Sequence, residues 1–387
     1  MKIIEFNDYS SKVGGAEAVF KRTVFDLEEK NEVYTISFDY FERKNHFKLH
    51  INTSRIGNIY NKFFFNPILY LKLKKILKSV SPDIIHLHNY NLSPLTVLLA
   101  VKNYKTIQTV HASGQICPSS WGAFRKNYKS CDILPEYKKC MKNCFYDKNR
   151  VLSTIYYLLN RQISRVRKNV IDGYIFPSNA LKTVFEKNGF KNLYVLNNPY
   201  SFDLKSKIHE PRTKENIILY VGKMIEMKGV HLLVNTLQDM NIPNWKFVFI
   251  GDGNLKEKLQ NISDDRFLFL GNLDHTELAF WYKLSTFVVI PSICFENYPN
   301  VALEAIENDC MVIGSNRGGI PEIISPELLL PVETFENTFG PKFFEILKNK
   351  QKYTEIIKNR KYRIKNVTYS KKLKTIFDNI NKGKLCQ

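Results

Sequence analysis

The sequence predicts an α/β fold of two doubly wound domains, each built on a parallel sheet between helices. Short apolar runs, typical of buried strands, alternate with segments of helical periodicity along nearly the whole chain. The alternation is interrupted near residues 199–214, where Pro199, Pro211 and several charges occur together. With 387 residues, of which 44% are hydrophobic, the chain is long enough for two domains with separate cores.

The N-terminal half contains six expected strands, most of them leading into a helix. A first helix is expected from the Gly14-Gly15 turn to about Lys30, followed by helices over residues 60–80, 94–101, 151–169 and 179–188. The strands are expected at residues 2–6, 33–38, 83–87, 105–110, 171–176 and 193–196.

Two turns in this half lie at carboxyl ends of strands, the edge at which α/β sheets bind ligands. Gly14 and Gly15 let the backbone approach a phosphate closely, or they serve only a turn that requires positive φ. His111 follows the strand at 105–110. It can hydrogen-bond a sugar hydroxyl or a phosphate oxygen, or it is a loop residue without a role. His86 and His88 end the preceding strand and have less support.

Residues 113–148 form an expected insertion that contains four of the seven cysteines. Four thiolates could bind zinc, but only Cys140 and Cys144 have the close spacing of a zinc ligand pair. The alternative is a flexible loop with free thiols, since disulfides are rare in a reducing cytosol. The cysteines of the insertion are Cys117, Cys131, Cys140 and Cys144.

The C-terminal half repeats the alternation of strands and helices. Strands are expected at residues 217–221, 246–250, 266–270, 287–290 and 311–314, helices over 333–366, and a last helix over 369–382. Lys223 and Lys228 follow the first of these strands, where two cations near a helix start can neutralise a diphosphate. Surface lysines are common in so basic a chain, so this pattern alone is not specific.

Residues 286–304 form a strand, a polar loop and a helix opened by Pro299 and Asn300. Glu296 lies on the loop and Glu304 on the helix, with seven residues between them. Carboxylates accept hydroxyl donors well, so such a pair can hold the two sugars of a nucleotide-sugar. Two solvated glutamates on an ordinary helix are the alternative.

The formal charge of +20 requires an anionic partner or reflects a Lys-rich composition. Basic and aromatic residues share the expected helix at 60–80, which suits either a membrane interface or a core-facing helix with a solvated lysine face. Met1 leads directly into a strand, and no apolar run approaches the ~20 residues of a membrane helix. We therefore expect a cytoplasmic protein, with peripheral contact at the inner face of the cell membrane left open.

The string PSICFENYPNVALEA resembles the donor-site signature of the family 4 retaining glycosyltransferases, in which two glutamates are separated by seven residues. The resemblance extends over nearly the whole chain except 113–148 and parts of 40–60. It implies the GT-B fold: two Rossmann-like domains that face a cleft, and a C-terminal helix that crosses back to the N-terminal domain. The expected domains are residues 1–200 on the acceptor side, 201–366 on the donor side, and the returning helix 367–387.

The same resemblance implies roles for individual residues. Glu304 would bind the nucleotide ribose, Glu296 would hold hydroxyls of the donor sugar, and Leu273 would lie by the base. Lys223 and Lys228 would bind the leaving diphosphate, although the family usually has Arg at the position of Lys223, and Lys lacks the bidentate fork. The backbone amides of Asn297 and Tyr298 would support the sugar and phosphates, Gly14 and Gly15 would cap the phosphates, and His111 would position the sugar.

The resemblance implies a retaining glycosyltransferase that requires no metal or cofactor, with a UDP-sugar as the favoured donor. The expected acceptor is a lipid-linked or growing surface glycan such as capsule or O-antigen, and no nucleic acid partner is expected. One alternative is a GT-B nucleotide-sugar epimerase, which would act without an acceptor. The other is a non-catalytic basic protein that binds membrane or nucleic acid, which strongly salt-dependent DNA binding would support.

Overall fold

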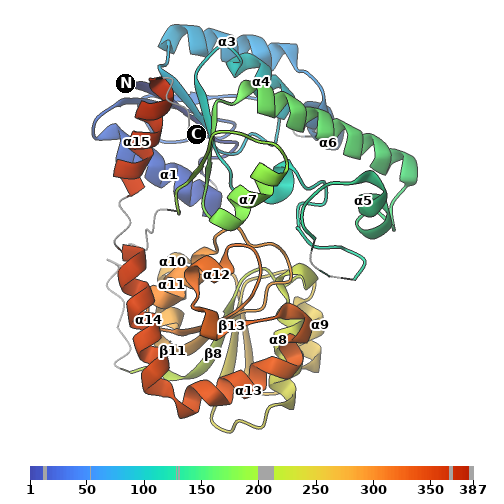
Figure 1. Cartoon of the computed structure of the whole chain (residues 1–387), viewed down its shortest axis with the longest axis vertical. Helices are drawn as coiled ribbons and strands as arrows, with labels where there is room; N and C mark the ends of the chain where they lie inside the picture. Colours follow the sequence, from blue (N-terminus) through green and yellow to red (C-terminus); the bar gives the residue numbers. More distant parts are fainter. Residues whose placement is uncertain are drawn as a thin grey trace. The chain divides into compact units, whose positions relative to one another are not determined.

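The structure, a computed structural model, describes residues 1–11, 15–52, 54–127, 129, 131–198, 213–365 and 369–382. These residues divide into two compact units (Figure 1). The first unit contains the described residues of 1–120, 132–198 and 369–382, and the second contains those of 121–131 and 213–365. The expected boundary near 199–214 lies almost entirely outside the described residues.

The first unit is built on a seven-stranded sheet in the order β3-β2-β1-β4-β5-β6-β7, and all its strand pairs are parallel. The order reverses between β1 and β4, so the crevice at their carboxyl ends is the topological switch point of this sheet. The strands are β1 Lys2–Phe6, β2 Glu32–Ser37, β3 His46–Lys48, β4 Ile84–Leu87, β5 Thr106–Thr109, β6 Gly173–Phe176 and β7 Leu193–Val195.

Helices flank this sheet. The prediction of one continuous helix over residues 60–80 is wrong. Two helices, α2 and α3, occupy the region, because Pro67 disfavours helical backbone at the residue before it. The Asn66 side chain caps the second of them by accepting from the Leu69 amide. The helices are α1 Gly15–Glu28, α2 Arg55–Phe63, α3 Pro67–Val80, α4 Pro94–Val101, η1 Ser113–Gln115, α5 Tyr137–Asn143, α6 Arg150–Val170, α7 Asn179–Lys187 and α15 Tyr369–Asn381.

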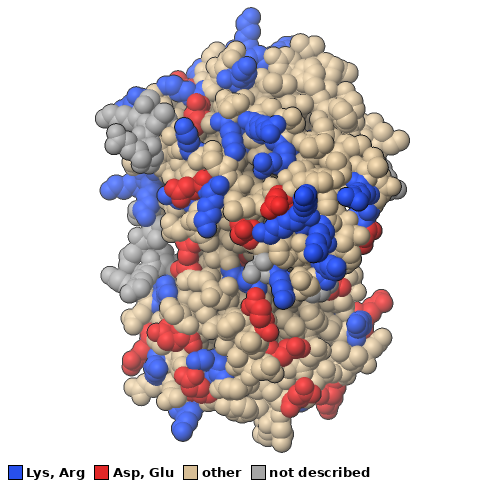
Figure 2. All heavy atoms as spheres, turned by 45° about the vertical axis from the view of Figure 1, so that its right-hand side comes forward, with Lys and Arg blue, Asp and Glu red and all other residues tan. Residues whose placement is uncertain are grey.

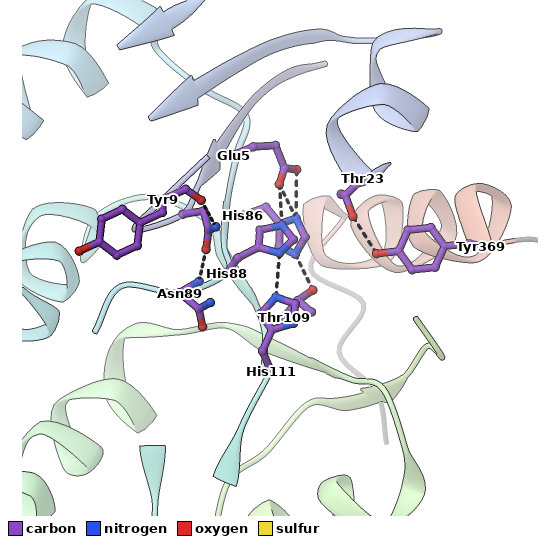
Figure 3. Close-up of polar contacts among 10 residues, drawn as sticks. Glu5, Tyr9, Thr23, His86, His88, Asn89, Thr109, His111 and Tyr369 are labelled. Atoms are coloured by element: carbon purple, nitrogen blue, oxygen red, sulfur yellow. Dashed lines mark hydrogen bonds and ion pairs between the residues drawn. The ribbon is translucent and has the colours of Figure 1, made fainter. Parts of the chain in front are cut away.

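The last helix, α15, packs in the core of the first unit although it follows the second unit in the chain. Leu373 and Phe377 on α15 are fully buried among residues of the first sheet and α1. The hydroxyls of Tyr369 and Thr23 of α1 lie 2.9 Å apart (Figure 3). A C-terminal helix that completes the first unit agrees with the predicted fold class.

The second unit has a six-stranded sheet in the order β10-β9-β8-β11-β12-β13, again with parallel pairs. Its order reverses between β8 and β11, which places its switch point at their carboxyl ends. The strands are β8 Glu215–Val221, β9 Lys246–Ile250, β10 Phe267–Gly271, β11 Ser285–Ile290, β12 Met311–Ser315 and β13 Leu329–Leu330. The helices are η2 Glu226–Lys228, α8 Val230–Asp239, α9 Lys256–Ile262, α10 His275–Leu284, α11 Asn300–Glu307, α12 Ile320–Ile323, η3 Pro326–Leu328, η4 Val332–Thr334, α13 Phe335–Lys348 and α14 Lys350–Lys365.

The expected insertion at 113–148 does not stay within one unit. The described residues of 121–131 belong to the second unit, where Ala123 and Trp121 pack with Met227, Ile293 and Cys294. The rest of the insertion, including α5, remains in the first unit. The described residues of 121–131 thus belong to a different compact unit from the rest of the insertion.

Among the described residues, no helix is both long enough and apolar enough to cross a membrane.

Candidate functional site

The loop between β11 and α11 places Glu296 at the switch point of the second sheet. Its carboxylate Oε1 accepts a hydrogen bond of 2.6 Å from Lys228 Nζ and another of 2.6 Å from the Ser292 hydroxyl. Lys228 ends the short helix η2 after β8, so the two charges come from the two strands between which the sheet order reverses. The Lys228 side chain is 27% exposed and the Glu296 side chain 13%, so a ligand can reach both.

Two glycines allow the loops around this ion pair to approach each other. Gly229 has φ +68°, and a Cβ there would lie 1.9 Å from the Pro291 carbonyl oxygen. Gly318 has φ +56°, and a Cβ there would lie 2.0 Å from the Glu296 carbonyl oxygen, which also accepts from the Gly319 amide at 2.7 Å. Both positions require glycine for conformation and for space. The backbone of Glu296 is thus held directly by its neighbours.

The protonation states of the pair are mutually stabilised. Burial alone would raise the pKa of Glu296, but the Lys228 charge and hydrogen bonds from Lys228 and Ser292 outweigh burial and lower it. Burial alone would lower the pKa of Lys228, but the Glu296 charge outweighs it and raises this pKa. At neutral pH the site therefore contains one carboxylate and one ammonium in contact.

Glu304 lies on α11, the helix that follows the loop of Glu296. Its Oε2 accepts a hydrogen bond of 2.8 Å from the Tyr282 hydroxyl of α10. Burial raises the pKa of Glu304, and this hydrogen bond opposes the rise only in part. Glu304 is therefore a partly buried carboxylate without the close cation that Glu296 has in Lys228.

The other predicted donor-site residues of this unit also lie after strand ends. Lys223 is exposed after β8, and its carbonyl accepts a hydrogen bond of 2.8 Å from the Tyr220 hydroxyl. Leu273 follows β10 and packs partly buried against the core. Asn297 and Tyr298 follow Glu296 in the loop, and burial raises the pKa of Tyr298 to about 12. The structure thus places them all on the carboxyl side of one sheet.

The sequence did not predict that residues 121–131 would contact this loop. The Phe295 amide donates to the Trp121 carbonyl at 2.9 Å, next to Glu296. Ala123 is 1% exposed in a small core with Ile293 and Cys294 of the same loop. The only sequence signal was the apolar pair Trp121 and Ala123 within an otherwise basic segment.

The first unit has a polar cluster at its own switch point (Figure 3). His111 follows β5, and its Nε2 lies 3.0 Å from His88 Nδ1 at the end of β4. His88 Nε2 lies 2.9 Å from Glu5 Oε2 of β1. Glu5 also contacts His86 Nδ1, and His86 Nε2 lies 2.8 Å from the Thr109 hydroxyl. The structure therefore connects His111 to a fully buried carboxylate, Glu5, which the sequence analysis did not select.

The predicted glycine turn is only partly described. Gly14 lies outside the described residues, and Gly15 begins α1 as an exposed residue. Ser10 and Ser11, the last described residues before this turn, donate their amides and hydroxyls to the carboxylate of Asp39. These hydrogen bonds hold the pKa of Asp39 well below its usual value, although burial opposes the shift.

Comparison with known proteins places the chain in a family. The family model for glycosyltransferase family 4 matches residues 13–203, and the model for glycosyl transferases group 1 matches residues 201–363. The chain is a family 4 glycosyltransferase of the GT-B type.

Individual relatives agree with this family over most of the chain. An N-acetylgalactosaminyltransferase of Campylobacter jejuni, named for an undecaprenol-linked acceptor, is 22% identical over 378 residues, or 92% of each chain. The structure superposes on sucrose-phosphate synthase of Thermosynechococcus elongatus with a TM-score of 0.74, 16% identity and 99% coverage of both chains. It superposes on Anabaena HepE in complex with UDP-glucose with a TM-score of 0.68, 16% identity and 99% coverage of both.

One group of metal-capable side chains occurs among the described residues of this glycosyltransferase, formed by Glu5, His86 and His88. No described cysteine belongs to it. Cys131 belongs to the second unit, whereas Cys117, Cys140 and Cys144 belong to the first. None of the four is in a disulfide.

Proposed function

We propose that this protein is a retaining glycosyltransferase that transfers a sugar from a nucleotide-diphosphate donor, with a UDP-sugar favoured. The contact of Lys228 with Glu296 at the switch point of the second sheet carries the proposal. A cation and a carboxylate at that edge match the two needs of such a donor, a charged diphosphate and a sugar rich in hydroxyls. A non-catalytic binding protein would not need a partly exposed Lys228–Glu296 pair on loops that approach each other closely at Gly229 and Gly318.

Each of these residues binds a different part of the donor. The Lys228 ammonium, with Lys223, stabilises the charge that grows on the leaving diphosphate. Glu296 holds sugar hydroxyls, supported by the backbone amides of Asn297 and Tyr298, and Glu304 holds the ribose. Leu273 contacts the base. Because Lys228 already contacts Glu296, the donor adds its phosphate oxygens to an ammonium whose position is set before binding.

In the transfer step, the bond from the anomeric carbon to the phosphate oxygen breaks, and a bond to the acceptor hydroxyl oxygen forms on the same face. The proton of the acceptor hydroxyl passes to the departing phosphate oxygen, so the configuration at the anomeric carbon is retained. From the first unit, His111 positions the sugar, and Gly14 and Gly15 cap the phosphates. No step in this scheme requires a metal ion.

Two comparisons support the choice of substrates. One structural neighbour is described in complex with UDP-glucose, which favours a UDP-sugar here. The Campylobacter relative is named for an undecaprenol-linked glycan, which favours a lipid-linked acceptor for surface polysaccharide. Such an acceptor would place the enzyme at the inner face of the cell membrane.

The surface of the first unit supports that membrane contact. Residues 1–200 contain 31 Lys and Arg against 15 Asp and Glu, a net +16 of the chain's +20. Figure 2 shows many of these basic side chains, in blue, on one face. Helices α2 and α6 of this unit are joined by a hydrogen bond of 3.2 Å from Lys62 Nζ to the Tyr156 hydroxyl, and both expose apolar side chains. The set comprises Ile56, Ile59, Tyr60, Val151, Leu152, Ile155 and Leu158, each 46–82% exposed.

Calorimetric titration with UDP, GDP and ADP, and with their sugars, tests the donor site. We expect UDP to bind and Glu304→Gln to weaken its binding at least 10-fold, because the ribose hydroxyls lose a charged acceptor. Glu307→Gln, three residues farther along α11, is the matched control and should bind as the wild type does. Preference for another nucleotide would change the donor, whereas no binding by any of them would contradict the proposed function.

A further inference from the structure

The polar cluster at the switch point of the first sheet forms a single chain of contacts. It runs from the Thr109 hydroxyl through His86 to Glu5, and from Glu5 through His88 to His111, with successive atoms 2.8–3.0 Å apart. Glu5, His86 and His88 have no exposed surface, whereas His111 is partly exposed (Figure 3). The cluster therefore connects a buried carboxylate to one partly exposed imidazole.

Burial keeps the imidazoles of this chain neutral. It lowers the pKa of His86, His88 and His111 to about 3, and the rings of Phe377 and Phe20 pack edge-on against His86 and His88. Burial also raises the pKa of Glu5, while hydrogen bonding and charge from His88 and the Arg43 guanidinium oppose the rise. Neutral imidazoles carry one proton each, so each ring has one donor and one acceptor nitrogen.

Those single protons can be assigned from the ends of the chain. With Glu5 ionised, its carboxylate accepts the hydrogen bond that His88 donates from Nε2, which leaves His88 Nδ1 as an acceptor. His111 must then donate from Nε2 to His88 Nδ1, which leaves His111 Nδ1 as its acceptor nitrogen. By the same logic His86 donates from Nδ1 to Glu5 and accepts from the Thr109 hydroxyl at Nε2. The arrangement satisfies every group in the chain.

We propose that Glu5 and His88 are positioning residues that fix the tautomer and ring orientation of His111 for sugar transfer. The logic is that of a catalytic triad, in which a buried carboxylate acts on the substrate only through an imidazole. The proposal rests on the proposed function for the claim that His111 contacts the sugar. The Nε2 proton of His111 is then held by His88 and is directed away from the substrate.

The same residues are the one metal-capable group found in the described part of the chain. Hydrogen bonds account for its geometry without an ion, because the Nδ1 of His86 and the Nε2 of His88 each lie 2.9 Å from Glu5 Oε2, an ordinary hydrogen-bond distance. The second ring nitrogen of each histidine also has a hydrogen-bond partner, Thr109 for His86 and His111 for His88. We therefore assign the group as a relay of hydrogen bonds.

His86 provides a matched control because it shares the carboxylate and the burial but leads to Thr109 instead of His111. His88→Gln keeps an amide donor in the place of Nε2 and removes the acceptor that faces His111. His86→Asn keeps an amide donor in the place of Nδ1 and removes the acceptor that faces Thr109. A purely structural role for the cluster predicts equal effects of the two variants on His111. The proposal predicts an effect of His88→Gln alone.

The test is nitrogen-15 NMR of histidine side chains in the full-length protein, which reports the tautomer directly and does not depend on the proposed function. We expect His111 to carry its proton on Nε2 in the wild type and in His86→Asn, and to lose this preference in His88→Gln and Glu5→Gln. A wild-type His111 protonated on Nδ1 would overturn the proposal even if no variant folds. So would zinc-dependent shifts of the His86 and His88 resonances that a chelator reverses.

Steady-state transfer assays add the functional test. We expect His88→Gln to lower kcat about 10-fold or more with little change in the KM for the donor, and His86→Asn to leave kcat within about 2-fold. Equal losses in both variants would overturn the positioning role. If the tautomer follows the prediction but no variant changes kcat, the relay exists and the role of His111 in transfer is what fails.

Discussion

Lys228 Nζ and Glu296 Oε1 lie 2.6 Å apart, although 67 residues separate the two in the chain. The contact joins the loops that follow β8 and β11, the two strands between which the order of the second sheet reverses. Because both side chains are partly buried, each depends on the other to remain charged. In the proposed donor site this charge pair is therefore formed before a donor binds.

Removing one member of this pair should cost more stability than removing both. We expect Lys228→Met to lower the free energy of unfolding by about 1–3 kcal/mol, because Glu296 loses its counter-charge. The double variant Lys228→Met/Glu296→Gln should recover most of this loss, while none of the variants transfers sugar. Urea unfolding measures the three free energies. A double variant that is no more stable than Lys228→Met would show that the pair is not coupled in solution.

The stability contributed by the pair should depend on pH in a defined direction. The pKa of Glu296 is lower in the folded state than in the unfolded state, so its contribution is complete above the unfolded pKa and is lost as pH falls. The pKa of Lys228 is raised, so its contribution is lost only in the alkaline range. The difference in unfolding free energy between wild type and the double variant should be constant from about pH 6 to 9 and shrink below about pH 4. A difference that grows on acidification would contradict this assignment.

Glycine substitutions should distinguish the site from the scaffold. Gly318→Ala requires a left-handed conformation and places a Cβ 2.0 Å from the Glu296 carbonyl oxygen, so we expect a loss of stability above about 2 kcal/mol and weaker donor binding. Gly340→Ala lies in α13 before Pro341, where a Cβ would meet Met240 Sδ at 4.0 Å, and should cost clearly less stability than Gly318→Ala because no backbone atom outside the helix lies in its way. Thermal unfolding compares the two. An equal response would argue against a strained contact at Glu296.

The exposed apolar set on α2 and α6 should mediate membrane binding. We expect Ile59→Ser combined with Ile155→Ser to weaken co-sedimentation with anionic phosphatidylglycerol vesicles at least 10-fold, because two exposed side chains lose their burial in lipid. Phe344→Ser on α13, where Phe344 is 50% exposed on the second unit, is the control and should bind as the wild type does. Unchanged binding of the double variant would exclude this surface as the membrane contact.

The order of strands and helices was largely available from the sequence, because parallel strands buried on both faces are continuous apolar runs. The short strands β3 and β13 were missed, since two or three residues carry no measurable periodicity. The helix expected over 60–80 failed because the Lys-rich periodicity concealed the break at Pro67. Glu296, Glu304 and the lysines could be selected as candidates because their positions on the loops and the helix that follow strands can be read from local sequence.

Glu5 could not be found in the same way. In the sequence, a polar residue such as Glu5 within an apolar strand suggests a strand with one solvent-exposed face. Only the structure shows that α1 and α15 cover this face of the sheet. Its partners lie more than 80 residues away, so their convergence is a property of strand order and not of spacing. The packing of Trp121 beside Glu296 is likewise a contact between distant segments. Local patterns can locate strand ends, but they do not show which strand ends meet.

The most direct test of the donor site is the fate of UDP-sugars incubated with the enzyme, followed by proton NMR without and with a lipid-linked acceptor. We predict release of UDP from one UDP-α-sugar, with the α-anomer formed first, and loss of this release in Glu296→Gln and Lys228→Met by about 100-fold or more. A first-formed β-anomer would contradict retention. Release that is unaffected by both substitutions would contradict the assignment of the Lys228–Glu296 pair as the site of transfer.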